Sequence, residues 1–92
     1  MSVNTKEIAV TSVEHQIDKN RFVLTENDNE CVLDYCLIDT LHGQKIDFTS
    51  TYVPLALRGQ GLAEQLVEVG LAWAKEQGYE IEASCWYVKN FL

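Results

Sequence analysis

Short runs of strand-forming residues, separated by turn residues, make up the first half of the chain. They predict strands at residues 10–15, 21–25, 31–38 and 44–53, with a dense turn signal at 26–29 and a second turn at 39–43. The last run alternates, which predicts a common face for four side chains, those of Ile46, Phe48, Ser50 and Tyr52. Pro54 ends this run, because proline cannot donate to a ladder of hydrogen bonds. The pattern predicts an antiparallel meander of about four strands.

The spacing of apolar residues becomes helical after Gly61. Leucine, valine, alanine and tryptophan recur on one side of the helical pattern, with most charged residues opposite. This predicts one long helix over about 61–77, anchored on the sheet by Trp73 and ended by Gly78. Residues 79–84 predict a fifth strand, parallel to the fourth after a right-handed crossover. The predicted fold class is α/β (α+β), a mixed and mostly antiparallel sheet of about five strands with one long helix packed on it.

The composition fits a single globular domain. The chain has 92 residues, of which 47% are hydrophobic and 23% charged, enough for one modest core. We expect a flexible N-terminus over residues 1–9 and one domain over 10–92. The most apolar stretch, 62–74, is too short and too charged to span a bilayer, and residues 1–9 lack the apolar core of a secretory signal. These features predict a cytoplasmic protein without membrane partners.

The net charge restricts the partners further. The formal charge is −7, from 14 acidic and 7 basic residues, which excludes the clustered basic surface of a non-specific nucleic-acid binder. An anionic ligand must be held by local donors, because the overall field repels it, whereas a cationic amine is attracted. The three cysteines are an odd number and form no CxxC pair, so we expect no metal site and no disulfide framework.

The segment from Val53 to Ala63 is the candidate binding loop. A strand leads into a loop with two glycines, Gly59 and Gly61, and the loop opens directly into the predicted helix. The first turn of a helix has backbone amides without internal partners, and its dipole favours an anion such as phosphate. Arg58 can add a charge-assisted contact. The alternative is a tight turn that needs glycine for structural reasons alone. The spacing is neither that of a Walker A loop nor that of a Rossmann fingerprint.

The run Arg58-x-x-Gly61-x-Ala63, preceded by Val53-Pro54, resembles the R/Q-x-x-G-x-G/A motif of the GNAT superfamily of N-acetyltransferases. With residues 51–54 and 84–88, the chain looks like the very small, single-domain GNAT-like subfamily represented by the N-acetyltransferase domain-containing proteins. The resemblance covers about residues 10–92 and implies a minimal GNAT-like fold. The helix pair between the first two strands and the strands after the fifth, which usually build the acceptor side of a GNAT domain, have no counterpart here.

The resemblance implies acetyl-CoA as cosubstrate. The pyrophosphate is expected on the backbone amides of six consecutive residues, Arg58, Gly59, Gln60, Gly61, Leu62 and Ala63. Main-chain groups near Tyr52 and Val53 are expected to pair with the pantetheine arm, between the diverging fourth and fifth strands.

Cys85 follows the fifth strand, and the resemblance implies an active-site cysteine there. Its thiolate can accept the acetyl group and pass it on, whereas the alternative is a small buried apolar residue. Cys31 and Cys36 are expected to be core residues. For direct transfer to an amine, Tyr87 is the candidate acid or a wall of the cleft. Four other side chains are available as acid or base, those of Tyr52, Asp47, Glu82 and His42.

The sequence therefore predicts an acetyl-CoA-dependent N-acetyltransferase, monomeric or weakly dimeric, that acts on an amine of an unknown small molecule or protein. One alternative is a non-catalytic module that binds or senses acetyl-CoA. Another is an interaction protein in which the glycine loop is only a turn.

Overall fold

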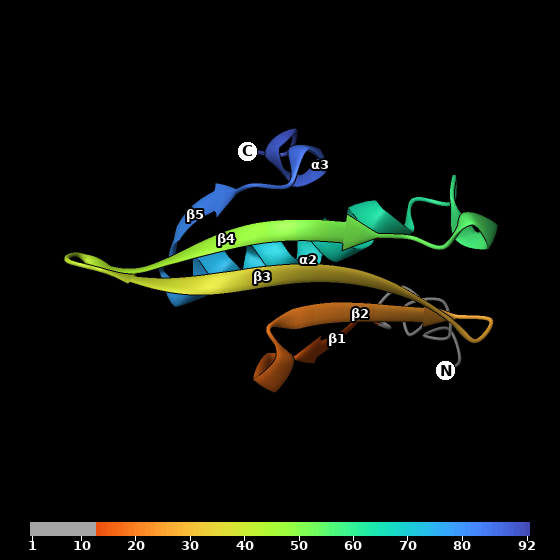
Figure 1. The fold of residues 1–92 in the computed structure, drawn as a ribbon, viewed down its shortest axis with the longest axis horizontal. Coiled ribbons are helices and arrows are strands. Elements are labelled where there is room, and N and C mark those ends of the chain that lie inside the picture. Colours follow the sequence, from red (N-terminus) through yellow and green to blue (C-terminus); the bar gives the residue numbers. More distant parts are fainter. Residues whose placement is uncertain (1–12) are drawn as a thin grey trace, which may run out of the picture.

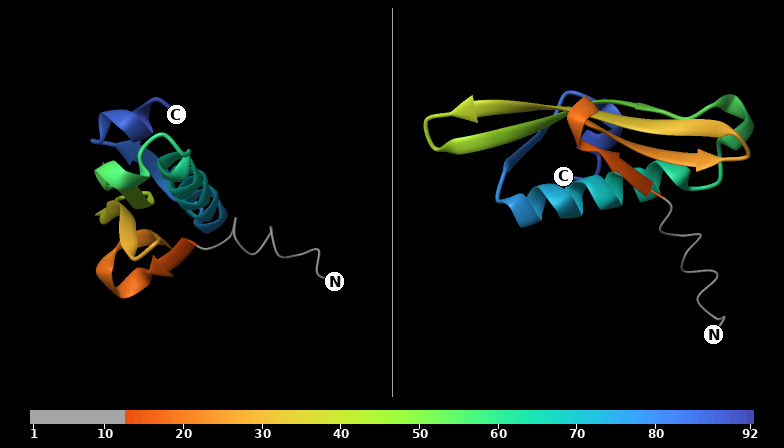
Figure 2. Two further views of the ribbon diagram at one scale, coloured as in Figure 1. Left: turned by 90° about the vertical axis from the view of Figure 1, so that its right-hand side faces the viewer. Right: turned by 90° about the horizontal axis from the view of Figure 1, so that it is seen from below.

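The fold is a five-stranded sheet with a long helix across one of its faces (Figure 1 and Figure 2). The computed structural model describes residues 13–92, so the predicted flexible segment 1–9 and the first residues of the predicted strand 10–15 lie outside the described part. The strands follow one another across the sheet in chain order: β1 (Val13–Gln16), β2 (Arg21–Glu26), β3 (Asn29–Thr40), β4 (Gly43–Tyr52) and β5 (Glu80–Ala83). The first four pair antiparallel and β5 pairs parallel with β4, which confirms the predicted fold class.

Helix α2 (Leu62–Gln77) makes the crossover between β4 and β5. Gly61 and Gly78 flank it, both with φ of +77°, a left-handed conformation that glycine adopts without steric cost. The amide of Gly78 donates to the carbonyl of Lys75, and the amide of Tyr79 donates to that of Ala74, both over 3.1 Å. The predicted glycine stop is thus the observed end of the helix.

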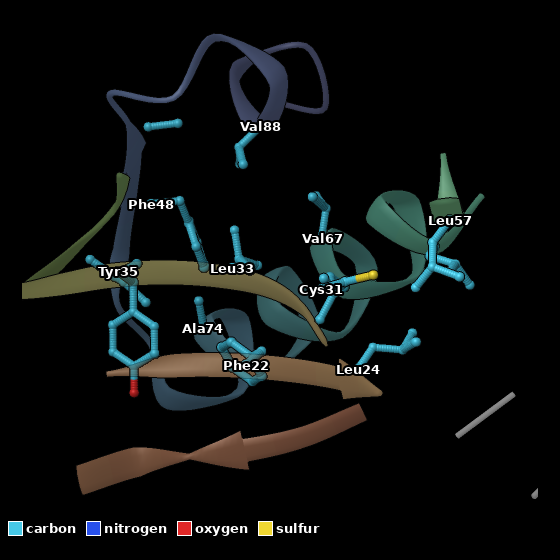
Figure 3. Close-up of a cluster of buried hydrophobic side chains, with 14 residues drawn as sticks. Phe22, Leu24, Cys31, Leu33, Tyr35, Phe48, Leu57, Val67, Ala74 and Val88 are labelled. Atoms are coloured by element: carbon cyan, nitrogen blue, oxygen red, sulfur yellow. The ribbon is translucent and has the colours of Figure 1, made fainter. Parts of the chain in front are cut away.

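The core lies between α2 and the sheet (Figure 3). Gly70 faces the sheet from the middle of α2, and a Cβ there would lie 2.9 Å from Cδ2 of Leu33 and 3.1 Å from Cε1 of Phe48. Trp73, partly buried, lies against the rings of His15, Phe22, Tyr35 and Tyr79, so it anchors the helix as predicted. The fully buried side chains come from β2, β3, β4, α2 and the C-terminal segment, and the largest include Phe22, Phe48, Leu24, Leu33, Ile46, Leu66 and Val88.

Cys31 is buried in this core, but Cys36 is exposed, so the prediction that both cysteines are core residues was wrong for Cys36. Cys36 lies in the part of β3 that extends beyond its pairing with β2, which ends at Asp34. Within residues 13–92, α2 is too short and too polar to count as a membrane span, and so are the shorter helices.

A bulge in β4 changes which side chains face the core. Tyr35 pairs with Phe48 and Asp34 pairs with Ser50, so Thr49 is an extra residue in β4. Ile46 and Phe48 are fully buried, but beyond the bulge Tyr52 is 57% exposed and Ser50 is exposed as well. The predicted common face for Ile46, Phe48, Ser50 and Tyr52 was therefore wrong in its second half, because the extra residue reverses the alternation.

Three short helical turns complete the fold. Two are 3₁₀ helices, η2 (Ile17–Lys19) between β1 and β2 and η3 (Leu55–Leu57) in the loop after β4. The third, α3 (Trp86–Lys89), follows β5 and buries Val88 in the core. The sequence pattern does not predict α3. In Figure 1, α3 and the loop that carries η3 both lie away from the turn between β3 and β4.

Candidate functional site

The candidate site lies where β4 and β5 separate. The two strands pair from Lys45 and Glu80 to Phe48 and Ala83, and the amide of Cys85 then donates to the carbonyl of Phe48 over 3.0 Å. Beyond this point β4 continues to Tyr52, whereas the chain after β5 turns into α3. The bulge at Thr49 lies at the same level, and bulges increase strand twist and bend the strand. Beyond the bulge, residues 50–52 of β4 pair with β3 and have no partner on the β5 side.

The loop after β4 brings the start of α2 to this opening. Gly59 (φ +84°) and Gly61 (φ +77°) both have left-handed backbone, which explains why glycine is needed at these positions. The amide of Gln65 donates to the carbonyl of Gly61 over 3.2 Å, and no side chain caps the helix start. The amides of Leu62, Ala63 and Glu64 therefore have no helical partner and are available to a ligand.

Two adjoining hollows connect the loop with Cys85. The first, of about 280 Å³, lies over the glycine loop and the helix start and reaches Glu64. The second, of about 380 Å³, reaches Cys85 and the exposed Trp86. Four residues line both hollows, namely Val53, Arg58, Ala63 and Tyr87.

The predicted site residues are therefore brought together, with one exception. Gly59, Gly61 and Leu62 line the first hollow, whereas Tyr52 and Cys85 line the second. Gln60 is exposed in the same loop but lines neither hollow.

Arg58 folds back over its own loop. Its Nε donates to the carbonyl oxygen of Val53 over 2.9 Å, and the side chain is exposed. This bond closes the short loop that contains η3 and holds the guanidinium at the junction of the two hollows. The remaining guanidinium N–H groups can reach an anion in either hollow after a rotation of the side chain.

Cys85 lies half-buried in the second hollow, directly before α3. Its Sγ is 3.5 Å from Oγ1 of Thr51, in the part of β4 that has no partner on the β5 side. Burial alone raises the pKa of the Cys85 thiol. Hydrogen bonds from the Thr51 side chain and from the backbone at Val88, Tyr87 and Thr51 outweigh it, so the pKa is lowered overall. A lowered pKa increases the thiolate fraction, which is the nucleophilic form.

Tyr87 lines both hollows from α3, and together the two hollows form a groove. The pKa of the Tyr87 phenol is raised. Burial is the main cause, and the negative charge of Glu64 adds to it. Tyr87 is consequently protonated at neutral pH and can donate a hydrogen bond into the groove. Glu64 also brings a negative charge to the rim of the first hollow, where the free amides of the helix start lie.

Three of the other candidate acids and bases have different roles in the structure. Both carboxylate oxygens of Asp47 accept hydrogen bonds from Ser84. Glu82 forms an ion pair with Lys45 over 3.2 Å. His42 is exposed in the turn between β3 and β4, ten residues along the chain from Tyr52 and at the other end of β4.

Thr51 is the contact that the sequence analysis missed, together with the pairing of Asp47 and Ser84. A strict alternation puts Thr51 on the face opposite Phe48, and only the bulge brings it beside Cys85. The described residues, 13–92, contain no cluster of three or more His, Cys, Asp or Glu side chains suited to a metal ion.

The sequence model of the family of GCN5-related N-acetyl-transferases matches residues 21–92 of the chain. These residues include all those that line the two hollows. The chain belongs to this family. The GNAT resemblance of the loop from Arg58 to Ala63 is thereby confirmed at the level of the family.

Curated relatives of this GNAT chain cover most of its length. It is 33% identical to Protein NATD1 of Bos taurus over 81 residues, which is 87% of this chain and 70% of the relative. Protein NATD1 of Gallus gallus and of Homo sapiens are each 32% identical, with 72% and 70% of their lengths covered. These relatives support a small GNAT-like protein.

A solved structure has a similar fold. The integron cassette protein HFX_CASS3, from the mobile metagenome of Cole Harbour Salt Marsh, matches with a TM-score of 0.60 over 68% of this chain. This GNAT chain spans only 43% of that protein's length, and the two are 14% identical. The likeness therefore concerns the fold alone.

Proposed function

We propose that this GNAT-family chain is an acetyl-CoA-dependent N-acetyltransferase that acetylates an amine of a small molecule or protein. The observation that supports the proposal most directly is the continuous groove between the free amides at the start of α2 and the Cys85 thiol. A ligand with a diphosphate at one end and a thioester at the other matches donors at one end and a nucleophile at the other.

In this proposal the diphosphate binds to the amides from Gly59 to Ala63, and Arg58 turns its guanidinium toward it. These contacts are local, so they suit a chain whose net charge of −7 repels anions at long range. The Arg58 amide, which the sequence also offered for the diphosphate, donates to the carbonyl of Leu55 over 3.3 Å. The pantetheine arm pairs with the backbone of Tyr52 and Val53, at the end of β4 where the strand has no partner on the β5 side. Backbone groups with a free edge are suited to an extended amide chain.

Cys85 is the proposed relay. Its thiolate attacks the thioester carbonyl carbon, a bond forms between Sγ and that carbon, and the bond from the carbon to the CoA sulfur breaks. Tyr87 gives its proton to the departing CoA thiolate. A neutral acceptor amine then attacks the acetyl carbon on Cys85, the bond to Sγ breaks, and the amine proton returns to the Tyr87 phenolate. The thiolate is regenerated and the acetyl group ends on nitrogen.

A second candidate function is a module that binds acetyl-CoA without turnover. It is favoured by the short connection between β1 and β2, which holds only η2 and Asn20 where a full GNAT domain has a pair of helices. Turnover with a broad panel of amines separates the two functions. A catalytic protein acetylates at least one amine of the panel, whereas a binding module acetylates none.

The glycines at the two ends of α2 provide a matched test of the binding site. Gly61 and Gly78 have the same φ of +77°, and a Cβ at either position meets no atom closer than 3.6 Å. Gly61→Ala and Gly78→Ala therefore impose a similar backbone strain, about 1 kcal/mol each.

We expect calorimetric titration to show acetyl-CoA binding to wild type and to Gly78→Ala, and binding at least about tenfold weaker to Gly61→Ala. Thermal unfolding of both variants measures their loss of stability, which we expect to be similar. Equal affinity in all three proteins would contradict the proposal and leave the glycine loop as a structural turn.

A further inference from the structure

Asp47 holds the backbone immediately before Cys85. One oxygen of its carboxylate, Oδ1, accepts a hydrogen bond from the Ser84 amide over 2.7 Å. The other, Oδ2, lies 2.7 Å from the Ser84 hydroxyl, which donates to it. Charge-assisted bonds of this length to both oxygens of one carboxylate fix position as well as distance.

The bonds lie at the last point where β4 and β5 pair. Asp47 is opposite Glu82, and the next pair, Phe48 and Ala83, is the final one. The amide of Cys85 donates to the carbonyl of Phe48 over 3.0 Å, so β4 holds two consecutive amides of the turn, those of residues 84 and 85. After this turn the chain leaves the sheet for α3, with Cys85 directly before the helix and its sulfur 3.5 Å from Oγ1 of Thr51.

We propose that Asp47 is a positioning residue for Cys85. Through Ser84 it fixes the turn that keeps the Cys85 sulfur at the start of α3 and within hydrogen-bond reach of Thr51. The inference rests on the proposed function, in which Cys85 is the nucleophile. Asp47 itself does not touch the substrate: it lines neither hollow, and Ser84 engages both of its oxygens.

Position and charge have opposite effects, which makes the inference testable. A carboxylate near a thiol disfavours the thiolate, so loss of the Asp47 charge alone would lower the pKa of Cys85. Loss of the fixed turn removes hydrogen bonds from the thiolate and raises that pKa. Asp47→Asn keeps an acceptor for the Ser84 amide and removes the charge, whereas Asp47→Ala removes both.

The measurement is the rate of iodoacetamide alkylation of Cys85 from pH 6 to 10, followed by intact mass. All proteins carry Cys36→Ser, because Cys36 is exposed and would react as well. Cys31 is fully buried and serves as an internal unreactive thiol. The control is Glu82→Gln, which breaks the ion pair with Lys45 between the same two strands but leaves the turn intact.

We expect Asp47→Ala to raise the apparent pKa of Cys85 by about one unit and to slow alkylation at pH 7 by about 3- to 10-fold. Ser84→Ala should change both quantities in the same direction but by less. The alkylation rates of Asp47→Asn and Glu82→Gln should stay within about twofold of the parent rate. An unchanged or lowered pKa in Asp47→Ala overturns the proposal. If Asp47→Ala does not fold by circular dichroism, Ser84→Ala decides by the same criterion.

Alkylation needs no acetyl-CoA, so the two proposals fail separately. Wild-type protein that forms no acetyl adduct on Cys85 would contradict the relay and leave the comparison of alkylation rates intact. An Asp47→Ala variant that alkylates like the parent protein would contradict the role of Asp47, whatever the fate of the acetyl group.

Discussion

Replacing Gly70 with alanine tests how closely α2 approaches the sheet. Gly70 is buried in the middle of the helix, and a Cβ there would lie 2.9 Å from Leu33, 3.1 Å from Phe48 and 3.5 Å from Phe22. All three neighbours are at most 1% exposed, so none of them can swing into solvent. The helix or the side chains must shift to accept the methyl group.

Two effects of opposite sign determine the magnitude. Alanine is favoured over glycine inside a helix by about 1 kcal/mol. Overpacking of a filled core costs about 1–3 kcal/mol, and three buried neighbours favour the upper half of that range. The free energy of unfolding is therefore expected to fall by about 1–2 kcal/mol, with a Tm lower by roughly 4–8 °C per kcal/mol in a domain of this size.

The assay is thermal and urea unfolding of Gly70→Ala beside Ala72→Gly. Ala72 is exposed on the same helix, so its replacement measures helix propensity alone and should cost about 1 kcal/mol. Gly70→Ala with a raised Tm, alongside a destabilised Ala72→Gly, would refute the close approach of helix and sheet.

Three further predictions concern titratable groups. Burial lowers the pKa of His15, whose ring stacks on Phe22 and whose Nε2 lies 2.7 Å from the Tyr35 hydroxyl. Folding thus favours the neutral ring, so the stabilisation by neutral His15 is complete above about pH 6.5 and is lost as the pH falls through the lowered pKa. The urea midpoint of His15→Phe should therefore depend less on pH than that of wild type. An equal pH dependence of the two midpoints would contradict this. Tyr87→Phe should slow acetylation of Cys85 by about 100-fold when the reaction is quenched at set times and followed by intact mass. An unchanged rate would exclude Tyr87 as the acid. Glu64→Gln should tighten acetyl-CoA binding by about 2- to 5-fold in low-salt titrations, because it removes a like charge beside the phosphate site; weaker binding would argue against a phosphate there.

The sequence predicted the elements of the fold because the hydrophobic periodicity and the positions of glycine and proline indicated the same boundaries. The glycine at 78 and the apolar spacing from Leu62 to Ala74 define α2 almost to the residue. The strand alternation put Ile46 and Phe48 on one face, and both are buried in the core. The loop from Arg58 to Ala63 was recognisable because a positive-φ glycine and free helix amides leave a local signature.

The details around Cys85 depend on features with no local signature. The extra residue at Thr49 follows from how β3 and β4 pair, and it alone turns Thr51 toward Cys85. The bonds from Asp47 to Ser84 join residues that are 37 positions apart. Helix α3 has only four residues, and tertiary contacts of the buried Val88 rather than propensity hold it in place.

Intact-mass analysis after mixing with acetyl-CoA is the most direct test of the account. Wild-type protein and Cys85→Ala are incubated with acetyl-CoA without acceptor, and peptide mapping locates any adduct. A relay through Cys85 predicts one acetyl group on Cys85 in wild type, none in Cys85→Ala, and loss of the adduct when an accepted amine is added. Acetyl-CoA binding without an adduct in wild type, together with unimpaired amine acetylation by Cys85→Ala, would contradict the relay and favour direct transfer.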